Sequence, residues 1–200
     1  MKKLFSLIIL LTTSLTNINH AFSISPDVFI QSTVNRASSL LSKDISKDEK
    51  MNQLKIIAKE TVDIRAIGFY SLGSARNNLN EMQNKTYSDL FEEYFLKSFS
   101  SRLAEYTNPE IEVKNKEVLN ENYTIVNSVL ISTAERPEVN INWRVYTKNS
   151  DSPLIRDLII EGLSLARTQK EEFSSILSSN DGDVNALFRV LEDFSKNWNF

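Results

Sequence analysis

The sequence predicts a single α+β domain in which helices pack on a curved, four-stranded antiparallel sheet. Apolar residues recur at helical spacing through residues 26–106 and again through 163–198. Between these two regions, apolar and polar residues alternate, as they do in half-buried strands. Helices and sheets each need a second layer against which to bury their apolar face, so this order favours helices packed on one sheet. Gly and Pro number only four each, and no linker or repeat divides the chain.

Two helices are expected at the start of the domain. Ser25-Pro26 is typical of a helix start with Pro at the first helical position, and the apolar stripe that follows extends this helix to about Ser42. Ser46 with Glu49 forms the pattern of a capping box, in which the serine side chain accepts a hydrogen bond from the third helical residue. A second helix should therefore follow this serine.

Two further helices are expected before the sheet. Asp63 can cap a third, short helix that ends near Gly73, and Thr86 with Asp89 indicates the start of a fourth. The fourth helix runs to about Tyr106 and is unusually rich in large apolar groups. These side chains could form an ordinary core or the wall of a binding cavity, and their periodicity does not distinguish the two.

Four strands and two helices complete the expected domain. The strands cover residues 111–119, 123–133, 139–147 and 154–161. The third strand alternates most cleanly, with Val139, Ile141, Trp143 and Val145 on one face. The last two helices are expected over residues 163–178 and 183–198, with Asp183 as the N-cap of the second.

The first 23 residues have the three-part layout of a secretory signal. A cationic start precedes an apolar run over residues 4–15, and Ala21 and Ser23 fit the −3 and −1 positions of a cleavage site before Ile24. Cleavage after Ala21 is the alternative. The apolar run is shorter than the roughly 20 residues that a spanning helix needs. We therefore expect residues 1–23 to be cleaved on export and residues 24–200 to form the mature domain.

The composition excludes most covalent chemistry. His20, the one histidine, leaves with the leader, and the chain has no cysteine. Ser-His-Asp and Cys-His sites are therefore excluded, and zinc or copper would lack their usual ligands. Carboxylates could hold Ca²⁺ or Mg²⁺, but the twelve-residue calcium loop pattern is missing.

Loss of Lys2 and Lys3 with the leader takes the formal net charge from −3 to −5, which argues against binding to nucleic acid. We expect no catalytic residue, no metal and no cofactor.

One enzyme class stays open as an alternative. Three carboxylates could support acid–base chemistry of an isomerase or hydratase, with Tyr94 or Tyr123 as a donor: Asp63, Asp157 and Glu161. Structural roles explain these carboxylates better. Asp63 is a helix cap and Glu161 lies at a strand end. Asp157 can pair with Arg144 or Arg156.

Three segments carry a family resemblance. The last strand and helix combine an aspartate, Glu-Gly-apolar-Ser-Leu, a basic residue and a phenylalanine, namely Asp157, Glu161, Gly162, Leu163, Ser164, Leu165, Lys170 and Phe173. Upstream, residues 62–67 lead to Leu72-Gly73, and residues 91–106 form a Phe-rich helix that ends in Tyr. In this order the segments resemble the MlaC-like (toluene-tolerance) family, periplasmic proteins that carry phospholipid between membranes.

The resemblance implies a strongly curved four-stranded antiparallel sheet wrapped by about six helices, an NTF2-like cup. Members of this family hold phospholipid tails inside this body and leave the head group near solvent. They shuttle lipid between an outer-membrane lipoprotein complex and an inner-membrane ABC transporter with its lipid-binding subunit, which maintains outer-membrane lipid asymmetry. We therefore expect a soluble, monomeric carrier in the periplasm, with phospholipid as its cargo.

Eleven apolar residues are predicted to line the lipid-binding cavity. The helices contribute Ile64, Ile67, Leu72, Phe91, Phe95 and Phe99, and the strands contribute Val129, Ile131, Trp143, Val145 and Ile159. The strand choices depend on which sheet face points inward, because a shift of one residue reverses the face. A third functional class also stays open: an adaptor that binds other envelope proteins and fills its interior with its own side chains.

Overall fold

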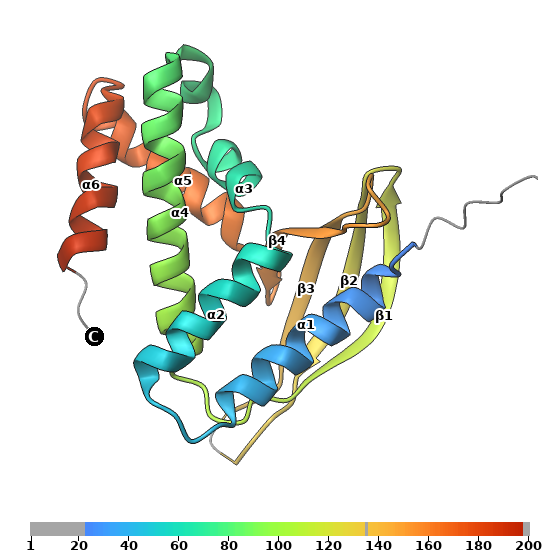
Figure 1. Ribbon diagram of the computed structural model, residues 1–200. Helices are drawn as coiled ribbons and strands as arrows, with labels where there is room; N and C mark the ends of the chain where they lie inside the picture. Colours follow the sequence, from blue (N-terminus) through green and yellow to red (C-terminus); the bar gives the residue numbers. More distant parts are fainter. Residues whose placement is uncertain (1–22, 135, 198–200) are drawn as a thin grey trace, which may run out of the picture.

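The computed structural model describes residues 23–134 and 136–197, and it has the predicted α+β architecture (Figure 1). Its helices are α1 (Pro26–Leu41), α2 (Lys47–Thr61), α3 (Ile64–Ser71), the 3₁₀ helix η1 (Gly73–Asn78), α4 (Glu81–Leu103), α5 (Leu165–Ser178) and α6 (Val184–Asn197). Its strands are β1 (Ile111–Asn120), β2 (Tyr123–Leu130), β3 (Val139–Tyr146), β4 (Leu154–Ile160) and β5 (Leu163–Ser164).

The predicted signal peptide, apart from its last residue, lies outside the described residues. Within the described ranges, no helix has both the length and the apolar character needed to cross a bilayer.

The strands form one open antiparallel sheet in the order β1-β2-β3-β4-β5. Register shifts between Val113 and Asn115 and between Arg144 and Val145 interrupt the ladders. Such bulges bend the strand that carries them and increase its twist. β1 forms one edge of the sheet and curves along its length (Figure 1). The predicted curved antiparallel sheet is confirmed.

The prediction of four strands is wrong by one short strand. Glu161 and Gly162 have φ angles of 48° and 82°, and two consecutive positive φ angles are the pattern of a type I′ hairpin turn. The turn pairs Leu163 with Ile160 and thereby creates β5. α5 consequently begins at Leu165, whereas the helical spacing predicts a start at residue 163.

The predicted caps of α2 and α3 are confirmed. Ser46 Oγ accepts a hydrogen bond from the backbone N–H of Glu49 at 3.1 Å. Asp63 Oδ1 accepts one from the backbone N–H of Ala66, also at 3.1 Å. Each cap satisfies a backbone donor that has no partner within the first turn of the helix. The short polar side chains therefore set where these two helices begin.

The predicted start of α4 near Thr86 is wrong. The helix begins at Glu81, because Asn80 and Gln83 form a reciprocal capping box six residues before Thr86. The side chain of Asn80 accepts from the backbone of Gln83 at 2.9 Å, and the side chain of Gln83 accepts from the backbone of Asn80 at 3.0 Å. An Asn-Gln pair can close this box as a Ser-Glu pair does, since both side chains carry the required oxygen.

The buried apolar residues form two main cores and one small cluster. The sheet core joins one sheet face to α1 and consists of Ile30, Val34, Val126, Val145 and Ile155. The helical core lies among α3, α4, α5 and α6, and its most enclosed members are Tyr87, Phe91, Leu72, Leu187 and Leu191. The α1–α2 cluster consists of Leu40, Leu41 and Leu54. In Figure 1, α1 crosses the sheet, and the helices of the helical core stand beside it.

Arg156 on β4 ties the start of α3 to the sheet. Its Nε donates to Asp63 Oδ2 at 2.8 Å, and its Nη1 donates to the hydroxyl of Tyr123 at 2.9 Å. The guanidinium also lies 3.6 Å from the ring centroid of Tyr146. In addition, the backbone N–H of Asp63 donates to the carbonyl of Ile155 at 2.9 Å. The same carboxylate thus caps α3 and pairs with the sheet.

Asp157, the next residue of β4, ties the start of α5 to the sheet. Its side chain is only 2 % exposed. It accepts from Ser164 Oγ at 2.6 Å and from the backbone N–H of Ala166 at 3.1 Å, and Arg144 Nη1 lies 3.3 Å away. Of the two ion-pair partners proposed from the sequence, Asp157 therefore takes Arg144. A buried carboxylate needs such partners, because it is very costly to bury alone.

Replacing Asp157 should test this junction. Asp157→Asn should lower the free energy of unfolding by about 2–3 kcal/mol, because Ser164, the backbone of Ala166 and Arg144 lose a charged acceptor. Urea unfolding followed by circular dichroism measures this loss. Asp151→Asn, in the exposed turn before β4, is the matched control and should change stability by no more than about 0.5 kcal/mol. Equal stability of the two variants would contradict the role given to the buried carboxylate.

Candidate functional site

The carboxylates considered for acid–base chemistry all have structural partners. Asp63 caps α3 and binds Arg156, and Asp157 is buried among three donors. Glu161 is exposed at the β4–β5 turn and accepts from the backbone N–H of Asn140. Among the described residues, no group of three or more His, Cys, Asp or Glu side chains is placed to hold a metal ion.

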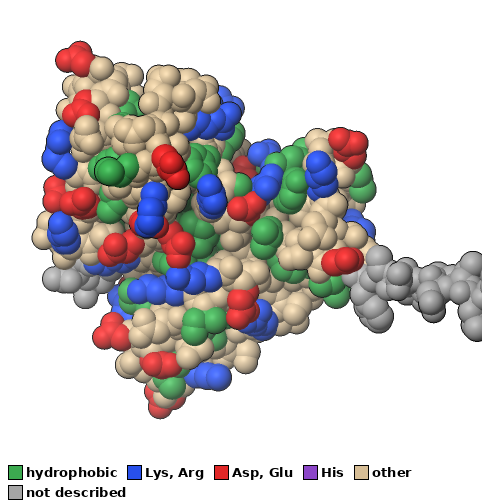
Figure 2. Space-filling view, turned by 45° about the horizontal axis from the view of Figure 1, so that its top comes forward, with side chains coloured by type: hydrophobic (Ala, Val, Ile, Leu, Met, Phe, Trp, Pro, Cys, Tyr) green, Lys and Arg blue, Asp and Glu red, His purple; other side chains and the backbone are tan. Residues whose placement is uncertain are grey.

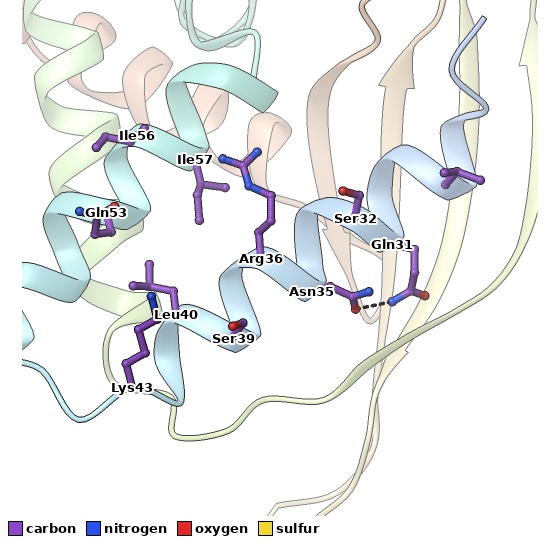
Figure 3. A pocket seen from close by; sticks show the side chains of 11 residues that line it. Gln31, Ser32, Asn35, Arg36, Ser39, Leu40, Lys43, Gln53, Ile56 and Ile57 are labelled. Carbon is purple, nitrogen blue, oxygen red and sulfur yellow. Dashed lines mark hydrogen bonds between the residues drawn. The ribbon is translucent and has the colours of Figure 1, made fainter.

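A groove of about 770 Å³ lies between α1 and α2, and it is the candidate functional site (Figure 3). Its lining residues come from one stripe of α1, the turn after it and a shorter stripe of α2: Val28, Gln31, Ser32, Asn35, Arg36, Ser39, Leu40, Lys43, Gln53, Ile56 and Ile57. The α1 positions recur every three or four residues, so they share one helix face. The volume falls within the range of roughly 300–1,000 Å³ that is usual for ligand pockets.

The groove has a polar and an apolar component. α1 contributes amide and hydroxyl side chains together with the guanidinium of Arg36, which extends toward α2 and pairs with Glu60 at 2.6 Å. α2 contributes Ile56 and Ile57, and Ile56 is 49 % exposed. At the other end of the groove Val28 is 61 % exposed. Apolar side chains with this much exposed surface are suited to contact with an amphiphilic molecule.

The polar wall of the groove is fixed to the edge of the sheet. Gln31 Oε1 accepts from the backbone N–H of Val113 on β1 at 3.1 Å, and its Nε2 donates to Asn35 at 2.8 Å. One turn earlier, Lys116 of β1 lies 2.7 Å from Asp27. The hydrogen bond from Lys116 lowers the pKa of Asp27 to about 2, and Ser25 adds to the effect. α1 therefore holds its position beside β1.

The apolar wall of the groove leads into the α1–α2 cluster. Leu40 belongs to both, and Ile57 lines the groove while packing against the cluster. In Figure 3 the side chain of Ile57 points from α2 toward α1, beside Arg36. Movement of α2 away from α1 would therefore extend the groove into apolar surroundings.

The six helical residues predicted to line the cavity belong to the helical core. Ile64, Ile67, Leu72 and Phe91 are buried in it, and Phe95 and Phe99 pack against it. None of these six lines the α1–α2 groove. In the structure these six side chains pack against one another in the helical core.

Phe91 shows how closely the helical core is filled. Its ring lies 5.8–6.2 Å, between centroids, from four other aromatic rings: Tyr87, Tyr94, Phe95 and Phe173. A Cβ placed on Gly68 would come within 2.7 Å of the Phe91 ring. Tyr87 donates from its hydroxyl to the carbonyl of Gly68 at 2.7 Å, and burial raises the pKa of Tyr87. These contacts favour the core interpretation of the aromatic helix.

The five predicted strand residues do not share one face of the sheet. Trp143 and Val145 point to the face covered by α1, where Trp143 pairs with Val126 and Val145 with Thr124. Val129 and Ile159 lie on the opposite face, because they pair with Asn140 and Asn142. The fifth residue, Ile131, follows β2. The predicted strand residues therefore lie on both faces of the sheet, since alternate residues of a strand point to opposite faces.

The α1–α2 groove was not predicted from the sequence, although one signal for it exists. Ile56 lies off the buried stripe of α2, which consists of Leu54, Ala58 and Thr61, and it is exposed although it is apolar. Val28 likewise lies off the buried stripe of α1. Exposed apolar residues on two consecutive helices thus indicate a shared groove, but only the packing angle of the helices shows that they meet.

Comparisons with known proteins give one family and one similar fold: the family comes from a family model, and the fold comes from a solved structure. A protein-family model described as "MlaC protein" matches residues 31–193. No curated protein matches the chain. Among solved structures, a phospholipid-binding protein from Ralstonia solanacearum, in complex with a phospholipid, is similar with a TM-score of 0.73 and 16 % sequence identity. The similarity covers 86 % of this chain and 97 % of that chain, and at this identity it concerns the fold.

Truncation of Phe91 should distinguish a filled helical core from a tail cavity. In lipid-free protein, Phe91→Ala should lower the free energy of unfolding by about 3–5 kcal/mol, because it leaves a hole in a packed core. Met82→Ala on the same helix is the control, since Met82 is 79 % exposed, and it should cost less than about 0.5 kcal/mol. A loss below about 2 kcal/mol for Phe91→Ala in chemical denaturation would indicate that the ring borders an open space.

Proposed function

Because the chain belongs to the MlaC protein family, we propose that it binds phospholipid and carries it across the periplasm. The family match carries this proposal, since it extends from α1 to α6 and includes the whole sheet. The fold similarity to a protein solved with a bound phospholipid supports it. The α1–α2 groove supplies a place for an amphiphile.

We propose that the lipid tails enter between α1 and α2. The groove offers Ile56 and Ile57 on one wall, and it continues into the α1–α2 cluster. Amide and hydroxyl groups of α1 and the cation Arg36 border the same space and suit the polar part of the lipid. A single cavity with both kinds of wall matches the division of a phospholipid into tails and head group.

The physical need for a carrier follows from the hydrocarbon tails. Each CH₂ group that leaves water for an apolar environment gains about 0.8 kcal/mol, so a free phospholipid stays in its membrane. A protein that shelters the tails makes the aqueous gap passable. No covalent step is needed, so we propose a binding and transport protein and no enzymatic activity.

The route of transport is part of the proposal. We propose that a leader over residues 1–23 directs export and is removed, so that residues 24–200 act as a monomeric periplasmic carrier. The carrier would shuttle lipid between an outer-membrane lipoprotein complex and an inner-membrane ABC transporter with its lipid-binding subunit. Maintenance of outer-membrane lipid asymmetry is the expected purpose. The leader pattern and the family membership support this route.

One observation favours a second function. The aromatic side chains of α4 fill the helical core, as expected of an adaptor that binds envelope proteins and has no room for cargo along this helix. An adaptor function does not explain the α1–α2 groove. The presence or absence of bound lipid separates the two functions.

Native mass spectrometry of gently purified mature protein should reveal copurified phospholipid. A peak displaced by the mass of one phospholipid is expected, because tails transferred from water gain about 0.8 kcal/mol per CH₂ group. Extraction with organic solvent should release the lipid and leave the apo mass. Protein that is wholly apo after purification from membranes and after incubation with phospholipid vesicles would contradict the carrier function.

A bulky side chain in the groove should block loading. Ile57→Trp should reduce the lipid-bound fraction roughly tenfold, because an overfilled apolar site costs about 1–3 kcal/mol. Val190→Trp is the control, since Val190 is 45 % exposed on α6 and does not line the groove. The bound fraction is read from the same mass spectra. An unchanged lipid-bound fraction in Ile57→Trp would show that the lipid tails bind outside the α1–α2 groove.

A further inference from the structure

Basic side chains of α3, η1 and α5 gather on a part of the surface distinct from the α1–α2 groove. This α3–α5 basic patch consists of Arg65, Arg76, Arg167 and Lys170 with the exposed ring of Tyr70. Phe69 links two of the cations: Arg65 Cζ lies 5.6 Å from its ring centroid, and Arg76 Nη1 lies 3.4 Å from its carbonyl oxygen. Lys170 Nζ lies 5.4 Å from the ring centroid of Tyr70.

The patch is hollowed where α3 meets α5. A pocket of about 540 Å³ is lined by Tyr70, Arg167, Lys170, Glu171 and Ser174. Gly73, with a φ angle of 60°, ends α3 beside this pocket, and a Cβ on it would lie 3.3 Å from Lys170 Cε. The missing side chain therefore leaves room for the lysine. Hydroxyl, ammonium and guanidinium donors thus border one recess.

Most of the cations in this recess and around it have no acidic partner. In residues 23–134 and 136–197, Arg65, Arg76 and Lys170 form no ion pair, and Arg167 pairs at 3.0 Å with Glu171. The nearby carboxylate at the start of α3, Asp63, is occupied by Arg156. Positive charge therefore remains uncompensated here.

Other parts of the surface carry positively and negatively charged side chains side by side. Figure 2 shows basic and acidic side chains interspersed over one face of the molecule. Lys59 pairs with Glu92 at 2.7 Å, and Lys85 pairs with Asp89 at 2.6 Å. The whole chain has a formal net charge of −3, so a negatively charged surface repels it in most orientations. The α3–α5 basic patch gives it one orientation in which the approach is favourable.

We propose that the α3–α5 basic patch docks the protein on the surface of a bilayer that contains anionic phospholipid. Lys and Arg near such a surface each contribute favourably, and exposed Tyr rings sit at the level of lipid head groups. A protein partner fits less well, because charged residues are depleted from the centre of protein interfaces and this recess is lined by three of them. The purpose of docking rests on the proposed carrier function, since a carrier must reach the membranes that it serves.

Sedimentation with vesicles tests the docking directly. The mature protein is mixed with vesicles of about 30 % phosphatidylglycerol in phosphatidylcholine, or of phosphatidylcholine alone, at low ionic strength. We expect binding to the anionic vesicles only, and loss of binding at about 0.5 M salt, where surface charges are screened within a few ångströms. The triple variant Arg65→Gln, Arg76→Gln, Lys170→Gln should bind about fivefold more weakly for each cation removed.

A charge-matched control is available on other elements. Lys114→Gln, Arg189→Gln, Lys196→Gln removes the same charge from β1 and α6 and should retain binding to anionic vesicles. Equal loss in both triple variants, or no binding by the unmodified protein, would overturn the proposal. Competition by millimolar glycerol 3-phosphate would also overturn it, because the recess would then take a soluble phosphate ester. Native mass spectra of the patch variant should keep their lipid peak, so a failure of docking is distinguishable from a failure of cargo binding.

Discussion

Two adjacent charged residues of β4 tie the starts of α3 and α5 to the sheet. Arg156 binds the carboxylate that caps α3, and Asp157 accepts from the first turn of α5. Both carboxylates of this junction lie at helix N-termini, where the helix dipole and the free N–H groups favour negative charge. Sheet and helical core are thereby fixed to each other without a disulfide, in a chain that has no cysteine.

The molecule combines a filled helical core with an open groove between α1 and α2. The helical core is closed by aromatic contacts around Phe91. By contrast, α1 and α2 meet over the small α1–α2 cluster and leave a groove with both polar and apolar walls. Gln31 and Asp27 hold α1 to β1, so α2 is the wall with fewer polar ties to the sheet. Cargo binding is accordingly proposed between these two helices.

The groove and the α3–α5 basic patch use different physical interactions. The groove has exposed apolar groups such as Val28 and Ile56, and apolar burial is insensitive to surface charge. Arg167 is the one cation of the patch that forms an ion pair within the described part of the chain, and the attraction of the patch to an anionic surface would depend on salt. Placing the two functions on separate elements lets each be altered without the other.

The sequence by itself determined the local features of this protein. Helix starts at Ser46 and Asp63 and the alternation of β3 follow from short segments, because caps and strand periodicity involve neighbouring residues. The start of α4 was missed only because an Asn-Gln box precedes the Thr-Asp pattern.

Only the tertiary structure decided which apolar side chains meet. Phe91 and Val129 are both apolar in sequence, yet one fills the helical core and the other lies on the sheet face away from α1. The α1–α2 groove likewise depends on the angle between two helices. Periodicity tells which side of an element is apolar, but it does not tell which partner covers that side or whether space is left between them.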